Sequence, residues 1–179
     1  GTALLTGWLS AGVPPGSVWV IEPNPTDWLK GTGVHLNQGI PSAPAVALLA
    51  VKPQMMGEAL PSLQALGNGS TLFVSIAAGT TIASFEDALG TRTPIVRTMP
   101  NTPAMVGRGI TAICRNSHVT DADFALARDL MAAVGQVVDL SGEDQIDAVT
   151  AVSGSGPAYV FHLIETMAAA GEAEGLPAD

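Results

Sequence analysis

Residues 46–51, VALLAV, and residues 71–76, TLFVSI, decide the fold of this 179-residue chain. The first run is continuously apolar between two prolines and predicts a strand that is buried on both faces, and the second run predicts another buried strand. A helix is expected after each of them, over residues 54–66 and 80–89. Strands that alternate with helices indicate an α/β fold with a mostly parallel sheet, because parallel strands need a crossover connection.

The same alternation extends in both directions along the chain. Hydrophobic spacing and turn residues predict, in chain order, a helix over 1–12, strands over 17–21, 94–97 and 109–115, a helix over 121–134 and a last strand over 136–140. No strand is expected after residue 144, where the pattern becomes helical. We therefore expect a doubly wound α/β domain over residues 1–142 and the start of an all-α domain over residues 143–179.

Both ends of the chain carry an interrupted helical pattern. The pattern is already present at residue 1, and residues 171–179 predict the end of one helix and the beginning of another. We therefore expect the chain to be a piece of a longer protein.

Composition and charge exclude several classes of protein. The formal net charge is -9, with 7 lysines and arginines, so the chain has no basic surface for nucleic acid. An anionic cofactor remains possible, because backbone amides at the beginning of a helix bind phosphate. The single Cys114 fits a reducing compartment, and no apolar run reaches the roughly 18 residues of a membrane span. We expect a cytoplasmic protein with neither a nucleic-acid partner nor a membrane segment.

Two residues are candidates for contact with a dinucleotide. Gly1, at the beginning of the first helix, is either the third glycine of a phosphate-binding turn or a glycine there by chance. Glu22 follows the strand at 17–21 and is either a ribose-binding carboxylate or a solvated turn residue. A carboxylate at this point should repel the extra phosphate of NADP, although Asn24 leaves the preference between NAD and NADP open.

Later strand ends and turns supply further candidates. Lys52 and Pro53 end the strand at 46–51, and residues 76–79, IAAG, offer small side chains that let backbone approach a planar ring. Residues 97–109, RTMPNTPAMVGRG, predict either a binding loop or a rigid turn held by side-chain hydrogen bonds. Residues 153–159, SGSGPAY, interrupt a helical pattern at a cost in helix stability, which favours a functional role.

Other reactive side chains fit no known arrangement. His35, His118 and His162 lack metal-ligand spacing, so no metal site is expected. Ser155 lacks the first glycine of a hydrolase nucleophile elbow, because position 153 is serine. Cys114 lies in an apolar strand and is expected to be an inert core residue.

Four motifs, taken together, resemble the pyrroline-5-carboxylate reductase family in their order and spacing: AVKPQ at 50–54, SIAAGTTI at 75–82, RTMPNTP at 97–103 and DAVTAVSGSGPAY at 147–159. The resemblance implies a Rossmann-like N-terminal domain and an α-helical C-terminal domain that interlocks with a partner subunit, giving a homodimer or a decamer built from dimers. It also implies the reaction, which is hydride transfer from NADPH or NADH to the C=N bond of 1-pyrroline-5-carboxylate to give L-proline.

The resemblance assigns roles to individual residues. It makes Gly1 the third glycine of the phosphate turn and places Glu143 against the substrate nitrogen, where a carboxylate favours the protonated iminium. The alternative for Glu143 is a cap on the helix that follows it. The resemblance also assigns cofactor contacts to a further set, in which Asn37 contacts a ribose and Ala78 lies beside the nicotinamide: Asn37, Ala50, Val51, Lys52, Pro53 and Ala78.

Two family elements are absent from the sequence. These are the first strand with its leading glycines and a later serine–proline–glycine–glycine–x–threonine loop, whose threonine meets the substrate from the partner subunit. The resemblance therefore leaves the catalytic residue unassigned, beyond residue 179, and implies that the chain is not competent alone. Two alternatives remain: a related imine or keto-acid reductase, which would lack SGSGPAY, and a non-catalytic dinucleotide-binding or dimerisation module.

Overall fold

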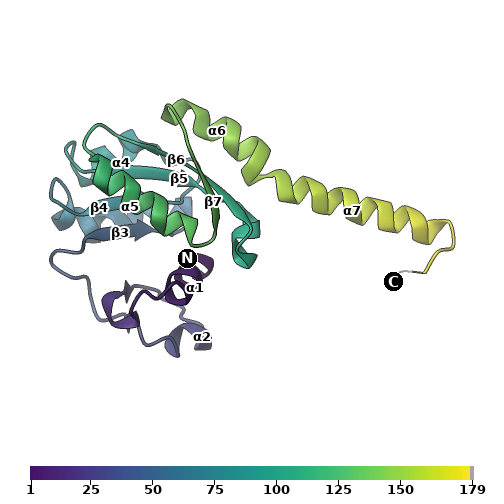
Figure 1. Ribbon diagram of the computed structural model, residues 1–179, viewed down its shortest axis with the longest axis horizontal. Helices are drawn as coiled ribbons and strands as arrows, with labels where there is room; N and C mark the ends of the chain where they lie inside the picture. Colours follow the sequence, from purple (N-terminus) through teal and green to yellow (C-terminus); the bar gives the residue numbers. More distant parts are fainter. Residues whose placement is uncertain (178–179) are drawn as a thin grey trace.

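The computed structural model describes residues 1–177 (Figure 1). The described strands form two sheets. Strands β1 (Trp19–Val20) and β2 (His35–Leu36) form a two-stranded parallel sheet. The second sheet has five strands in the order β3-β4-β5-β6-β7, with bounds Val46–Leu49, Leu72–Ser75, Ile95–Met99, Gly109–Arg115 and Gly135–Asp139. Only the β5–β6 pair is antiparallel among the described strands, so the predicted mostly parallel sheet is confirmed.

Helices cover both faces of the five-stranded sheet, which confirms the doubly wound fold. Helices α1 (Thr2–Ser10) and α5 (Asp121–Ala132) pack on the face that carries Val74 and Val96. Helices α3 (Met56–Ala59), α4 (Ile82–Leu89) and α6 (Ile146–Val149) pack on the opposite face, which carries Phe73 and Ile95. Successive residues of a strand point to opposite faces, so each central strand contributes to both cores.

The central strands are fully buried, whereas β3 is not. Every residue of β4 and β5 is buried, as expected for strands covered on both sides. In β3 only Leu49 is buried, so the predicted burial on both faces is wrong. The reason is position: β3 is the outermost strand of its sheet in the described part of the chain and has a neighbour on one side only.

Residues 25–66 differ most from the predicted elements. The single helix expected over residues 54–66 is wrong, because the segment folds as a 3-10 turn Pro53–Met55, α3, and a 3-10 helix Leu60–Leu66. Pro61 lacks an amide hydrogen and ends the α-helix there. The short helix α2 (Asp27–Lys30) and the strand β2 were not predicted at all, since elements of four and two residues carry almost no periodicity.

The chain beyond β7 is helical in the described residues. A 3-10 turn Glu143–Gln145 leads into α6, a π-helical turn Thr150–Gly154 and the long helix α7 (Gly156–Ala173). Figure 1 shows α7 projecting away from the sheet. The new helix expected within 171–179 includes Ala178 and Asp179, which lie outside the described residues. No helix in the described range is long and apolar enough to cross a membrane.

Candidate functional site

Several of the predicted residues follow the ends of parallel strands in the two sheets, and of the predicted cofactor residues Gly1 lines the cavity at this edge. Glu22 follows β1, Ala50 follows β3, Ala78 follows β4 and Asn101 follows β5. In doubly wound folds this carboxyl edge of the sheet is the ligand crevice. A cavity of about 250 Å³ opens there, and its lining includes Gly1, Ile76, Pro100, Asn101, Met105 and Gly154.

Gly1 lies at the beginning of α1 and close to two other predicted residues. A Cβ added to Gly1 would stand 3.7 Å from the Cβ atom of Ala50, so the helix start and the end of β3 are adjacent. Burial lowers the pKa of the Gly1 amino group, and the charge of Glu22 raises it in opposition. The carboxylate of Glu22 therefore lies near the N-terminus of α1, where the first amide hydrogens lack partners within the helix.

Glu22 and Asn37 are joined by two reciprocal hydrogen bonds. The Glu22 N–H donates to Asn37 Oδ1 at 2.9 Å, and Asn37 Nδ2 donates to the Glu22 carbonyl oxygen, also at 2.9 Å. Asn37 takes a positive φ of 54°, which asparagine tolerates better than most residues. The amide of Asn37 thus holds the chain at Glu22, a function that the resemblance did not indicate; its contact with a ribose stays a prediction.

The ends of β3 and β4 expose small or flexible side chains to the crevice edge. Lys52 is exposed at the residue before the 3-10 turn, where Pro53 fixes the exit of the chain. After β4, Ala77 is buried in the core whereas Ala78 is exposed. A methyl group at position 78 leaves room for a flat ring to approach the backbone.

The two most distinctive motifs meet at this edge. Asn101, in RTMPNTP, donates from Nδ2 to the hydroxyl of Ser153, in SGSGPAY, at 3.3 Å. Its Oδ1 accepts the Ile110 N–H at 2.9 Å, which holds the turn after β5. A Cβ added to Gly154 would stand 3.6 Å from Met99 Sδ. Asn101 therefore both stabilises the turn and joins it to the helical segment. Asn101 and Ser153 are 52 residues apart in sequence, so local patterns do not reveal this hydrogen bond.

Glu143 is tied to the α/β domain through one carboxylate oxygen. Its Oε1 accepts from Arg97 Nη1 at 2.6 Å and from the Ile82 N–H at 2.7 Å. The Arg97 side chain is only 3% exposed, and its Nε has no hydrogen-bond partner. The expected alternative, a cap on the following helix, is wrong in its target, because Glu143 caps the beginning of α4 instead. Its contact with the substrate nitrogen stays a prediction.

Arg97 is a residue that the sequence analysis missed. A charged side chain within the buried strand IVRTM requires a partner, since an unpaired charge in the core is strongly unfavourable. The sequence predicts Arg97 both at the end of the strand at 94–97 and at the start of the loop at 97–109, and the available signal for a buried charge is its position within the strand.

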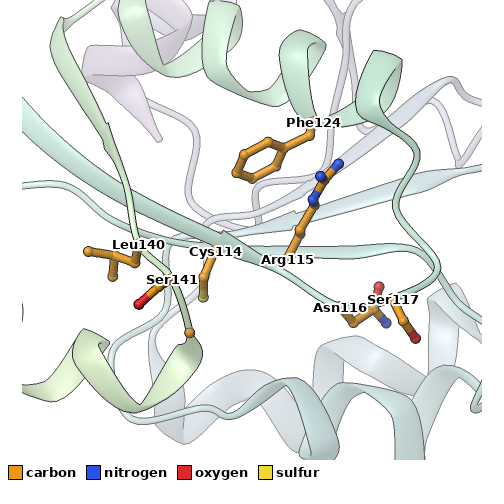
Figure 2. A pocket seen from close by; sticks show the side chains of 8 residues that line it. Cys114, Arg115, Asn116, Ser117, Phe124, Leu140 and Ser141 are labelled. Carbon is orange, nitrogen blue, oxygen red and sulfur yellow. The ribbon is translucent and has the colours of Figure 1, made fainter.

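A second cavity, of about 380 Å³, lies at the opposite edge of the sheet. Figure 2 shows its lining, with Arg115 beside the Phe124 ring and Cys114 beside Ser141. The Arg115 guanidinium lies 4.6 Å from the ring centroid and pairs with Asp121 at 2.8 Å. This charge already has partners within the protein, and the three parallel strands that carry the predicted motifs, β3, β4 and β5, begin rather than end at this edge, so the cavity is not the candidate site.

Cys114, at the floor of that second cavity, is buried and free of any disulfide. Burial raises the pKa of its thiol to about 11, and the nearby charge of Glu143 adds to the effect. A thiol that stays protonated is a poor nucleophile. The prediction of an inert core cysteine is confirmed.

His35 has a structural role in the two-stranded sheet. The His35 ring stacks on Trp19 with centroids 4.3 Å apart, and its two nitrogen atoms lie 3.0 Å from Gln38 Oε1 and from the Gly16 carbonyl oxygen. Across residues 1–177, no three or more histidine, cysteine, aspartate or glutamate side chains come together as a metal-binding group.

Comparison with known proteins agrees with this geometry. Residues 143–179 match the family model described as "Pyrroline-5-carboxylate reductase dimerisation". A pyrroline-5-carboxylate reductase from Pseudomonas aeruginosa is 41% identical over 180 residues, which cover 97% of this chain and 66% of the relative. The chain therefore spans about two thirds of the length of such relatives.

Solved structures of the same family share the fold. The pyrroline-5-carboxylate reductase from Coxiella burnetii superimposes with a TM-score of 0.87 at 34% identity, covering 99% of this chain and 68% of that one. The pyrroline carboxylate reductase from Plasmodium falciparum, with NADP bound, gives a TM-score of 0.87 at 30% identity and covers 99% and 67%. The chain carries its distinctive motifs at one edge of the sheet and is similar to these relatives in sequence and structure. It therefore belongs to the pyrroline-5-carboxylate reductase family.

Proposed function

We propose that the full-length protein is an NADPH- or NADH-dependent reductase of 1-pyrroline-5-carboxylate that forms L-proline, the last step of proline biosynthesis. The observation that carries this proposal is the hydrogen bond between Asn101 and Ser153, which brings RTMPNTP and SGSGPAY to the carboxyl edge of the sheet. The identity of 41% to the Pseudomonas aeruginosa enzyme supports the same reaction.

The residues at the strand ends suit a dinucleotide. The N-terminus of α1 at Gly1 would hold the pyrophosphate, and Glu22 would accept hydrogen bonds from the adenosine ribose. We propose that Asn37 and residues 50–53 complete the cofactor contacts and that the exposed methyl group of Ala78 lies beside the nicotinamide. When bound, the nicotinamide supplies the hydride; the protein orients it and excludes water.

For the substrate side we propose Glu143. Both donors that contact its carboxylate use Oε1, and the side chain is 29% exposed, so Oε2 is the oxygen that would face an iminium nitrogen. A carboxylate near that nitrogen favours the protonated iminium, which is the better hydride acceptor. Addition of the hydride to the iminium carbon would convert the C=N bond to a C–N single bond and leave the ring nitrogen as a neutral amine.

We further propose a homodimer in the cytoplasm, with residues 1–142 as the cofactor domain and residues 143–179 as the beginning of the dimerisation domain. The match of residues 143–179 to a dimerisation family model supports this division. A decamer built from dimers is the larger assembly that we propose, and light scattering on the full-length protein distinguishes it from the dimer.

Cofactor titration distinguishes this function from its alternatives. We expect the full-length protein to bind a reduced nicotinamide cofactor and to oxidise it only when pyrroline-5-carboxylate is added, as followed by cofactor absorbance. Oxidation with other imines or keto acids but not with this substrate would indicate a related reductase. Binding without turnover on any of them would indicate a non-catalytic module.

A further inference from the structure

We propose that Glu22, held in place by Asn37, makes this protein select NADH over NADPH. The inference rests on the cofactor-binding function proposed above and adds the choice between the two nucleotides. It follows from three observations: how the chain at Glu22 is held, what lies next to its carboxylate, and which cations are available nearby.

Several hydrogen bonds fix the chain at the end of β1. The Asn37 N–H donates to the Val20 carbonyl oxygen at 2.8 Å, and the Asn37 side chain exchanges two hydrogen bonds with the backbone of Glu22. The carboxylate is fixed as well, because its Oε1 accepts the Asn24 N–H at 3.0 Å. Asn24, which left the nucleotide preference open in the sequence, thus stabilises the Glu22 carboxylate in the structure.

The fixed carboxylate lies near the beginning of α1. Glu22 comes two residues after the end of β1, and Gly1 at that helix start lies against Ala50 at the end of β3. In doubly wound folds an acidic side chain at this position accepts hydrogen bonds from the ribose 2′- and 3′-hydroxyl groups of NADH. In NADPH the 2′-hydroxyl carries a phosphate, and its negative charge would lie beside the carboxylate of Glu22.

Residues 1–51, which contain Glu22 and Asn37, hold no unpaired lysine or arginine to offset this repulsion, and the next cation along the chain is the exposed Lys52 after β3. Lys30 is the only lysine or arginine among residues 1–51, and its Nζ lies 2.8 Å from Asp27 Oδ1. The His35 ring is stacked on Trp19 and has an oxygen atom 3.0 Å from each nitrogen. Binding of a 2′-phosphate in this fold usually uses a nearby arginine, and the first arginine of the sequence is Arg92.

Dissociation constants measured by calorimetry on the full-length protein test the proposal. We expect NADH to bind more tightly than NADPH by about tenfold, the scale of like charges held in contact in a wet site. Glu22→Gln keeps the side-chain oxygen that accepts from Asn24 and removes the charge. This variant should therefore bring the two constants to within about threefold of each other, mainly by tightening NADPH.

Two further variants test whether the nucleotide preference depends on the position of the Glu22 carboxylate or on the overall charge of the protein. Asp129→Asn removes the same charge from an exposed side chain on α5 and should leave the ratio of the two constants unchanged. Asn37→Gly preserves the positive φ but removes the side-chain bonds to Glu22, and should weaken NADH more than NADPH. A purely structural function of Asn37 would instead weaken both nucleotides by the same factor.

The outcomes are distinct. Tighter binding of NADPH by the unmodified protein, or equal changes for both nucleotides in Glu22→Gln, would overturn the selection proposed for Glu22. If circular dichroism shows that the Glu22→Gln protein is unfolded, the test rests on the ratio of the NADH and NADPH dissociation constants in the unmodified protein. Binding of neither nucleotide would refute the proposed function itself.

Discussion

Arg97 and Glu143 show how one pair of side chains joins the two parts of the chain. Arg97 lies in the buried strand β5, and Glu143 begins the helical segment after β7. The same carboxylate oxygen also accepts the Ile82 N–H at the beginning of α4. Three segments therefore depend on one carboxylate, and any effect of Glu143 on the substrate acts from this fixed position.

Replacing Glu143 separates its two functions. We expect Glu143→Ala in the full-length enzyme to raise the KM for pyrroline-5-carboxylate more than the KM for the cofactor, because the iminium loses a neighbouring carboxylate. The loss of a partner for the buried Arg97 should also lower the free energy of unfolding by about 2–3 kcal/mol, measured in urea.

Asp147→Asn is the matched control for this prediction. The Asp147 side chain is 90% exposed and lies 3.9 Å from the Arg97 guanidinium, so its loss should change stability by less than about 0.5 kcal/mol. Equal increases in both KM values for Glu143→Ala would refute the substrate contact and leave Glu143 with a structural function only.

Cys114 gives a prediction about reactivity. Because burial raises the thiol pKa from 9.0 to about 11, the folded protein keeps the thiol protonated while an unfolded chain ionises above about pH 9. The contribution of Cys114 to stability is therefore complete below pH 9 and decreases as the pH rises towards 11. At pH 8 we expect a thiol reagent to modify Cys114 only in denaturant; rapid modification of the native protein would contradict its burial.

At the scale of helices and strands, the sequence predicted the buried and capped elements best. The runs at 71–76 and 94–97 became β4 and β5, because strands buried on both faces need continuous apolar residues. The helix expected over 121–134 became α5, which begins after the cap residue Thr120. The prediction that β3 is buried on both faces was wrong, because burial depends on which strands lie beside it. Local sequence does not contain that information.

The candidate site was predictable only in part. Residues at strand ends, such as Ala78 and Lys52, follow from the fold class, since parallel strands end at one edge. The pairs that hold the site, Glu22 with Asn37 and Asn101 with Ser153, are 15 and 52 residues apart. Their partners are chosen by tertiary packing, so no local pattern indicates them.

The cap of α5 allows a test at this scale. Thr120 Oγ1 accepts the Asp123 N–H at 3.1 Å and donates to Asp123 Oδ2 at 2.7 Å. Thr120→Ala should therefore lower the free energy of unfolding by about 1 kcal/mol in urea denaturation. Thr120→Ser retains the hydroxyl and should restore most of the loss; equal loss in both variants would show that the cap contributes little.

At the scale of the whole molecule, helix α7 is the feature that indicates binding to another protein chain. Its apolar side chains are exposed in the single chain, with Tyr159 at 61%, Phe161 at 65%, Ile164 at 57% and Met167 at 66%. An exposed apolar surface of this kind marks an interaction site in a folded protein. The dimerisation family model covers this helix, which supports a second copy of the same protein as the partner.

A charge on α7 tests this assembly. We expect Ile164→Glu to raise the dissociation constant of the homodimer by at least about tenfold, because a buried carboxylate at the interface would lack a partner. Analytical ultracentrifugation of the full-length protein measures this constant. Glu165→Gln, a change at the neighbouring exposed residue, is the control and should leave it unchanged; dimers unaffected by Ile164→Glu would place the interface elsewhere.

If the full-length protein reduces a cyclic imine with a nicotinamide cofactor, the direct measurement is the amount of L-proline formed for each NADH or NADPH oxidised. The full-length protein, given 1-pyrroline-5-carboxylate and reduced cofactor, should form proline and oxidised cofactor in equal amounts, because one hydride reduces one C=N bond. Cofactor that binds without any proline being formed would contradict the account.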